Sequence, residues 1–174
     1  MKKIVVMLIA AAMVVSLMAS CGDDKQQTAG QDTEVSSATE LTDNTLGQII
    51  ADAAEIGDGT AGVSLKRTEI AARIISYAAK MGFSADDTEK LKEEFLTKID
   101  ALDEDKKTNV NNTFMDAFEI LDKAVVDGDY DSVKGQFEDA GVSEGIDIIL
   151  NAPGLRESYD TFRSAYLTMG NSDK

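Results

Sequence analysis

The feature that most constrains the fold of this chain is the helical spacing of its apolar residues between positions 46 and 169. In five stretches these residues recur every three or four positions, which places them on one face of an amphipathic helix. Strict alternation of apolar and polar residues, the pattern of a half-buried strand, is hard to find. The stripes are Leu46, Ile49, Ile50 and Ala53; Ile70, Ile74, Ala78 and Met81; Leu91, Phe95, Ile99 and Leu102; Val110, Phe114, Phe118, Leu121 and Val125; and Leu155, Tyr159, Phe162, Tyr166 and Met169. The sequence therefore predicts an all-α fold.

Residues typical of helix ends lie between these stripes. Ser84, followed three residues later by Asp87, fits a capping box, and Pro153 suits the first turn of a last helix. Glycines stand where helices should stop, at Gly82, Gly128 and Gly141. We expect a single helical array of about six or seven helices over residues 41–170, followed by a tail at 171–174.

The segment between residues 133 and 150 has a shorter apolar pattern that glycines interrupt. This pattern predicts two brief helices. The second would carry four apolar residues buried on all sides: Ile146, Ile148, Ile149 and Leu150.

The composition narrows the possible chemistry. The 174 residues include no His, one Cys, 32 acidic and 17 basic side chains. Without His the chain lacks an imidazole general base, a Ser/His or Cys/His nucleophile pair, and the commonest zinc ligand. We therefore favour a binding or assembly role and assign no catalytic residue and no cofactor. A carboxylate-dependent hydrolase remains an alternative, although the carboxylates are too plentiful to single out one pair.

The amino-terminal segment reads as a secretion signal. Lys2 and Lys3 precede an apolar run over residues 4–17 that only Ser16 interrupts. About 20 apolar residues are needed to cross a bilayer, so this run is too short for a membrane span. Small residues end the run directly before the only cysteine, Cys21. We predict a signal peptide over residues 1–20.

The sequence Met18-Ala19-Ser20-Cys21 resembles the lipobox of bacterial lipoproteins, with Met18 where Leu is most frequent. The resemblance implies cleavage before Cys21, fatty acylation such as palmitoylation of its sulfur, and usually acylation of the new amino group. In many Gram-negative lipoproteins an Asp after the cysteine favours inner-membrane retention, and this chain has Gly22 there. The resemblance therefore implies a lipid anchor in the outer membrane, on either its periplasmic or its surface-exposed face.

The residues after Cys21 are polar and acidic. Residues 22–40 are rich in Asp, Gln, Thr, Ser and Gly, so we expect residues 21–40 to form a flexible tether between the acylated cysteine and the helical domain. Loss of residues 1–20 would remove two lysines and no acid, which leaves a formal charge of −17. Such a charge argues against a general nucleic-acid binder and predicts a protein partner with a basic surface.

One acidic stretch resembles the calcium-binding loop of an EF-hand. Its candidate ligands are Asp127, Asp129, Asp131 and, at the twelfth position, Glu138. Ser132 stands where the loop needs Gly, and Lys134 stands where an apolar residue normally packs. We therefore predict no metal here and expect a turn whose aspartates cap the next helix and face solvent. A calcium-responsive module remains an alternative.

Arg67 and Arg73 are a further candidate pair, because two guanidinium groups can grip a carboxylate or a phosphate together. Six residues apart on a helix, they are expected on opposite sides. Joint action on one anion is therefore disfavoured.

Overall fold

The structure, a computed structural model, describes residues 45–169. The predicted signal peptide, Cys21, the linker to residue 40 and the tail at 171–174 lie outside the described residues. Seven α-helices and no strand are found in residues 45–169, which confirms the all-α fold. The helices are α1 (Leu46–Ala54), α2 (Val63–Met81), α3 (Thr88–Asp100), α4 (Glu104–Leu121), α5 (Lys134–Asp139), α6 (Ile146–Leu150) and α7 (Leu155–Thr168).

Three short helical segments join these helices. The 3₁₀ turn η2 (Ala85–Asp87) leads into α3, the π-helical turn η3 (Asp122–Val126) continues α4, and the 3₁₀ turn η4 (Tyr130–Ser132) precedes α5. The two brief helices expected between residues 133 and 150 are present as α5 and α6.

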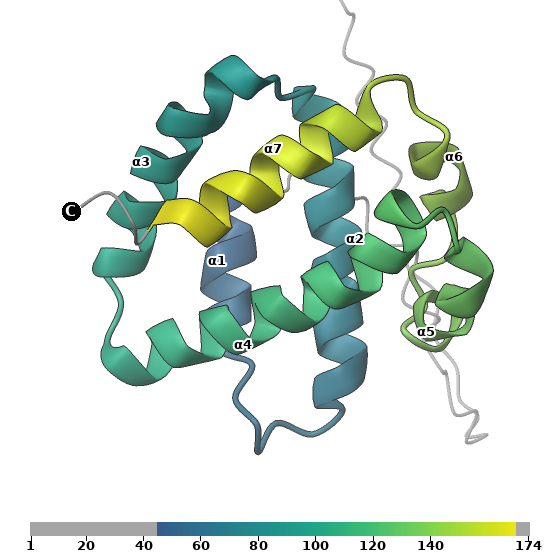
Figure 1. Ribbon diagram of the computed structural model, residues 1–174. Coiled ribbons are helices and arrows are strands. Elements are labelled where there is room, and N and C mark those ends of the chain that lie inside the picture. Colours follow the sequence, from purple (N-terminus) through teal and green to yellow (C-terminus); the bar gives the residue numbers. More distant parts are fainter. Residues whose placement is uncertain (1–44, 170–174) are drawn as a thin grey trace, which may run out of the picture. The chain divides into compact units, whose positions relative to one another are not determined.

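Helix α2 is central to the packing. It contacts α1, α4, α5, α6 and α7, while α3 packs on α7 and α1. In Figure 1, α1 and α2 lie side by side and run in opposite directions, and α4 and α7 lie across them. Helices α5 and α6 lie at one end of this arrangement, close to the start of α7. The chain therefore returns to α2 repeatedly, and one shared core forms between helices distant in sequence.

Aromatic residues of α3, α4 and α7 form the centre of that core. Phe162 of α7 is fully buried, and its ring centroid lies 5.2 Å from that of Phe95 and 6.4 Å from that of Phe118. Tyr166 stacks on Phe114 with a centroid distance of 4.7 Å. Such ring pairs add to the stabilisation that comes from burying their apolar area. The stripes of the third, fourth and fifth sequence stretches therefore meet in one place.

The predicted helix ends are largely confirmed. Ser84 and Asp87 form the capping box, with the backbone N–H of Ser84 donating to the Asp87 carboxylate at 2.9 Å. The Ser84 hydroxyl donates a second hydrogen bond to the same carboxylate at 3.0 Å. The backbone and side-chain bonds from Ser84 hold the pKa of Asp87 below its usual range. Gly82 ends α2 with a φ of 61°, a left-handed conformation that favours glycine.

Three expectations from the sequence are wrong. Ile148 is not buried but 79% exposed, because it lies about 200° around the helix from the fully buried Ile146. Met81, the last residue of α2, is 51% exposed. Pro153 precedes the last helix, since α7 begins at Leu155 after Gly154, whose φ of 77° is not helical.

Candidate functional site beside the π-helical turn

The most unusual local structure in residues 45–169 is the π-helical turn after α4. Its backbone hydrogen bonds span five residues, whereas those of an α-helix span four. The backbone N–H of Asp127 donates to the carbonyl of Asp122 at 2.9 Å. Such turns are rare in proteins, and those that occur are often found at functional sites. The turn is therefore the starting point for the candidate site.

Side chains of α7 hold the first residue of this turn. Asp122 accepts a hydrogen bond from the Tyr159 hydroxyl at 2.8 Å, and its other carboxylate oxygen pairs with the Arg163 guanidinium at 2.8 Å. Burial, together with the hydrogen bond to Asp122, raises the pKa of Tyr159. Tyr159 therefore stays protonated and keeps donating this hydrogen bond over the ordinary pH range.

Arg156 holds the other end of the turn. Its guanidinium donates to the carbonyl oxygens of Val126 at 2.9 Å and Val125 at 3.3 Å, and it also binds the Asp160 carboxylate at 2.7 Å. The terminal carbonyls of a helix lack intrahelical partners, and a guanidinium satisfies them. Thus one face of α7 fixes both ends of the turn.

A pocket of about 450 Å³ opens beside the turn. It is formed by η3, η4, α6 and the start of α7, and its volume is in the range of small-ligand sites. Its lining includes apolar side chains and four polar ones, namely Tyr130, Asp147, Asn151 and Arg156. Gly128 and Gly154 border the pocket, and a Cβ at either position would meet no atom within 4 Å.

Tyr130 is the most informative residue of the pocket lining. Its hydroxyl oxygen is buried and has no hydrogen-bond partner within the part of the chain that the structure describes. Burial raises the pKa of Tyr130, and the nearby carboxylates of Asp147, Glu138 and Asp131 raise it further. The Tyr130 hydroxyl therefore has carboxylates nearby and no hydrogen-bond partner among the described residues.

The four candidate calcium ligands do not form a site. Asp127, Asp129, Asp131 and Glu138 are all exposed, and Glu138 pairs with Lys134 at 3.9 Å. Within residues 45–169, no group of three or more acidic, His or Cys side chains is arranged to hold a metal ion. The expectation that these aspartates face solvent is confirmed, but the expectation that they cap the next helix is wrong, because neither η4 nor α5 has a side-chain cap. Instead, the Ser132 hydroxyl donates to the backbone carbonyl of Asp129 at 2.8 Å.

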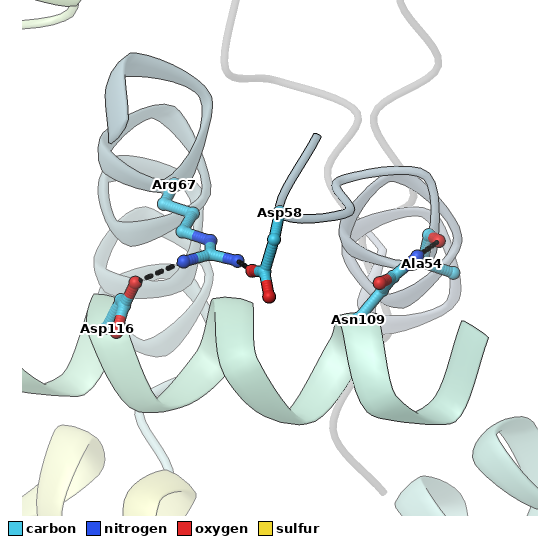
Figure 2. Close-up of polar contacts among 5 residues, drawn as sticks. All are labelled: Ala54, Asp58, Arg67, Asn109 and Asp116. Atoms are coloured by element: carbon cyan, nitrogen blue, oxygen red, sulfur yellow. Dashed lines mark hydrogen bonds and ion pairs between the residues drawn. The ribbon is translucent and has the colours of Figure 1, made fainter. Parts of the chain in front are cut away.

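The two arginines of α2 bind separate carboxylates. Figure 2 shows Arg67 reaching Asp58 in the loop after α1 and Asp116 on α4, at 2.8 and 2.7 Å. Burial opposes the charge of Arg67, but the hydrogen bonds to Asp58 and Asp116 outweigh it and raise the pKa of Arg67. Arg73 pairs with Asp52 of α1. This cluster joins α2 to its neighbours and already contains the anions that its guanidinium groups bind.

A second polar contact in Figure 2 supports the same loop. The side-chain amide of Asn109 on α4 donates to the carbonyl of Ala54 at 2.9 Å, where α1 ends. Asn109 thereby attaches the start of the loop to α4, and Arg67 attaches Asp58 in the loop to α2. These contacts therefore have a structural role, because they hold the loop against α2 and α4.

The sequence did not identify the residues of the candidate site as a group. One sequence pattern could have indicated part of the site. Polar residues recur every three or four positions beside the apolar stripe of α7, at Arg156, Tyr159, Asp160 and Arg163. Tyr130 and Asp147 are 17 positions apart and carry no such pattern.

Comparison of the chain with protein-family models, with curated proteins and with solved structures found no match. Within residues 45–169, no helix combines the length and apolar character that crossing a bilayer requires.

Proposed function

We propose that this protein is a lipid-anchored protein of the bacterial cell envelope, held in the outer membrane by acylated Cys21, and that its helical domain binds a protein partner with a basic surface. The observation that carries the proposal is the position of the only cysteine, directly after a basic and apolar signal-like segment and the small residues Ala19 and Ser20. Two or three acyl chains anchor a protein stably, whereas one chain binds a membrane only marginally.

The charge of the helical domain supports the proposed type of partner. Residues 45–169 contain 25 acidic and 13 basic side chains. Both arginines of α2 and both arginines of α7 are paired with carboxylates, so their charges are locally balanced. A domain with this excess of carboxylates attracts basic surfaces and repels acidic ones.

The anchor is tested by fractionating cells that express the wild type or the Cys21→Ser variant. The wild type should pellet with membranes and carry an acylated amino-terminal cysteine in mass spectra, and the variant should lose the acyl mass. Ser20→Ala is the matched control, because it keeps a small residue before the cysteine and should still be acylated. A wild-type amino terminus with an unmodified thiol would overturn the proposed anchor.

The sorting step has its own test. Gly22→Asp places the retention residue after the cysteine and should shift the protein from the outer- to the inner-membrane fraction on a density gradient. An unchanged distribution would overturn the outer-membrane assignment and leave the acylation result standing.

The partner is tested by cross-linking the wild-type protein in cells and purifying it from detergent extracts. The captured protein should have a basic surface, and its association should slow as the salt concentration rises. Association that is indifferent to ionic strength would contradict an electrostatic partner.

A further inference from the structure

We propose that the pocket beside η3 binds an alkylammonium group, and that the group comes from a lysine side chain of the basic partner. This inference rests on the proposed function, because it names the recognition element of that binding role. The pocket is lined by η3, η4, α6 and the start of α7.

The charges around the pocket select a cation. Asp147 is an exposed carboxylate in the lining, and Asp131 and Glu138 act on Tyr130 from nearby. Arg156 is the one basic residue of the lining, and it is occupied by Asp160 and by two backbone carbonyls. The lining therefore offers a carboxylate to a ligand but no comparably free cation.

Tyr130 adds one interaction suited to an ammonium group. Its hydroxyl oxygen lacks a partner in residues 45–169 and can accept a hydrogen bond. A buried hydroxyl without a hydrogen bond is unfavourable for folding. A phenylalanine would fill the same space without this cost, so the hydroxyl is better explained by a ligand than by stability.

The lining also fits the stem of the ligand. The volume of about 450 Å³ accommodates a lysine side chain. The four methylene groups of that side chain would contact the apolar residues of the lining, which are Ala124, Val125, Leu150, Ala152 and Leu155. Next to Asp147 in the sequence, Ile148 is 79% exposed and offers the partner an apolar contact outside the pocket. The same short helix thus presents a charge to the ammonium group and an apolar side chain to the surrounding peptide.

The first experiment titrates the full chain, purified in detergent, with n-butylammonium chloride while amide NMR shifts are recorded. Sodium chloride and sodium butyrate at equal ionic strength are the controls. We expect saturable shifts centred on Tyr130, Asp147 and Asn151 with butylammonium alone. Equal binding of butyrate, or shifts that spread over the domain without saturating, would overturn the proposal.

Variants then assign the interaction. Asp147→Asn should weaken butylammonium binding about twofold to fivefold, the effect typical of one exposed ion pair. Glu144→Gln removes an equal charge from an exposed residue outside the lining and should leave binding unchanged. Tyr130→Phe should weaken binding while the thermal unfolding temperature stays the same or rises. If Asp147→Asn and Glu144→Gln behave alike, specific recognition at the pocket is overturned.

A last comparison separates a free amine from a lysine side chain. A lysine-containing basic peptide should bind more tightly than butylammonium, and acetylation of its lysine should abolish the shifts at the pocket. Ile148→Ser should weaken binding of the peptide and leave binding of butylammonium unchanged. Equal affinity of peptide and amine would overturn the lysine source in favour of a small amine. If the pocket fails these tests but the native protein still captures a basic partner in a salt-sensitive way, only this inference falls.

Discussion

The hydroxyl of Ser158 on α7 donates a hydrogen bond to the carbonyl oxygen of Ala78 near the end of α2, at 2.6 Å across 80 positions of the chain. The same hydroxyl oxygen accepts a hydrogen bond from the backbone N–H of Phe83 at 2.8 Å. Ser158 is only 1% exposed. One buried side chain therefore satisfies backbone groups where α2 ends and fixes α7 against that end.

Replacing this serine should destabilise the domain. In Ser158→Ala the N–H of Phe83 loses its partner, whereas the Ala78 carbonyl keeps its bond from the N–H of Gly82 at 2.9 Å. We expect a loss of about 1–3 kcal/mol in the free energy of unfolding, measured by urea denaturation. Ser164→Ala, at an exposed position of α7, is the control and should change stability by less than about 0.5 kcal/mol. Equal stabilities of the two variants would contradict the role of the Ser158 hydroxyl.

The buried tyrosines should make the domain sensitive to alkali. Burial raises the pKa of Tyr166, and burial with the bond to Asp122 raises that of Tyr159, whereas an unfolded tyrosine titrates near about 10. Above that pH the unfolded chain loses these protons and the folded domain keeps them. Stability should therefore be insensitive to both tyrosines below about pH 10 and should fall above it.

Tyr166→Phe isolates one of these contributions. The stability of the wild type relative to this variant should drop by about 1 kcal/mol between pH 10 and pH 11, because only the wild type loses that proton on unfolding. Urea denaturation at both pH values measures the difference. A difference that stays constant with pH would show that Tyr166 titrates normally in the folded domain.

The arginine cluster of α2 should respond unevenly to substitution. Arg67→Lys replaces a fork that reaches Asp58 and Asp116 with a single ammonium group, so we expect a loss of about 1 kcal/mol. Asp58→Asn should cost less than about 0.5 kcal/mol, because the Asp58 side chain is 80% exposed. Chemical denaturation compares the two. A larger loss of stability in Asp58→Asn than in Arg67→Lys would contradict this prediction. It would show that the contact of Arg67 with the loop stabilises the domain more than its contact with Asp116 on α4.

Calcium is predicted not to bind tightly between Asp127 and Glu138. Lys134 lies 3.9 Å from Glu138 and adds positive charge, and Ser132 occupies the position where an EF-hand loop needs Gly. Titration calorimetry with calcium chloride should show no micromolar site. A micromolar site that disappears in Asp127→Ala would contradict this prediction and restore the calcium-responsive alternative.

The sequence alone determined the helical class and most of the buried face of each long helix. Phe114, Phe118 and Phe162 are buried as their spacing predicts, because a helix repeats every 3.6 residues and its apolar side must be covered. The capping box of Ser84 and Asp87 was also readable, since its partners are three residues apart. These features depend on neighbours within one or two turns of the chain.

Only the tertiary structure decided the partners between segments and the candidate site. The bonds from Tyr159 and Arg163 to Asp122 join residues at least 37 positions apart, and the pocket joins Tyr130 to Asp147 through the packing of short helices. The exposure of Ile148 was likewise decided by which side of α6 meets α2. Local periodicity identifies an apolar side but cannot state which distant segment covers it, because that choice is made by the packing of all the helices together.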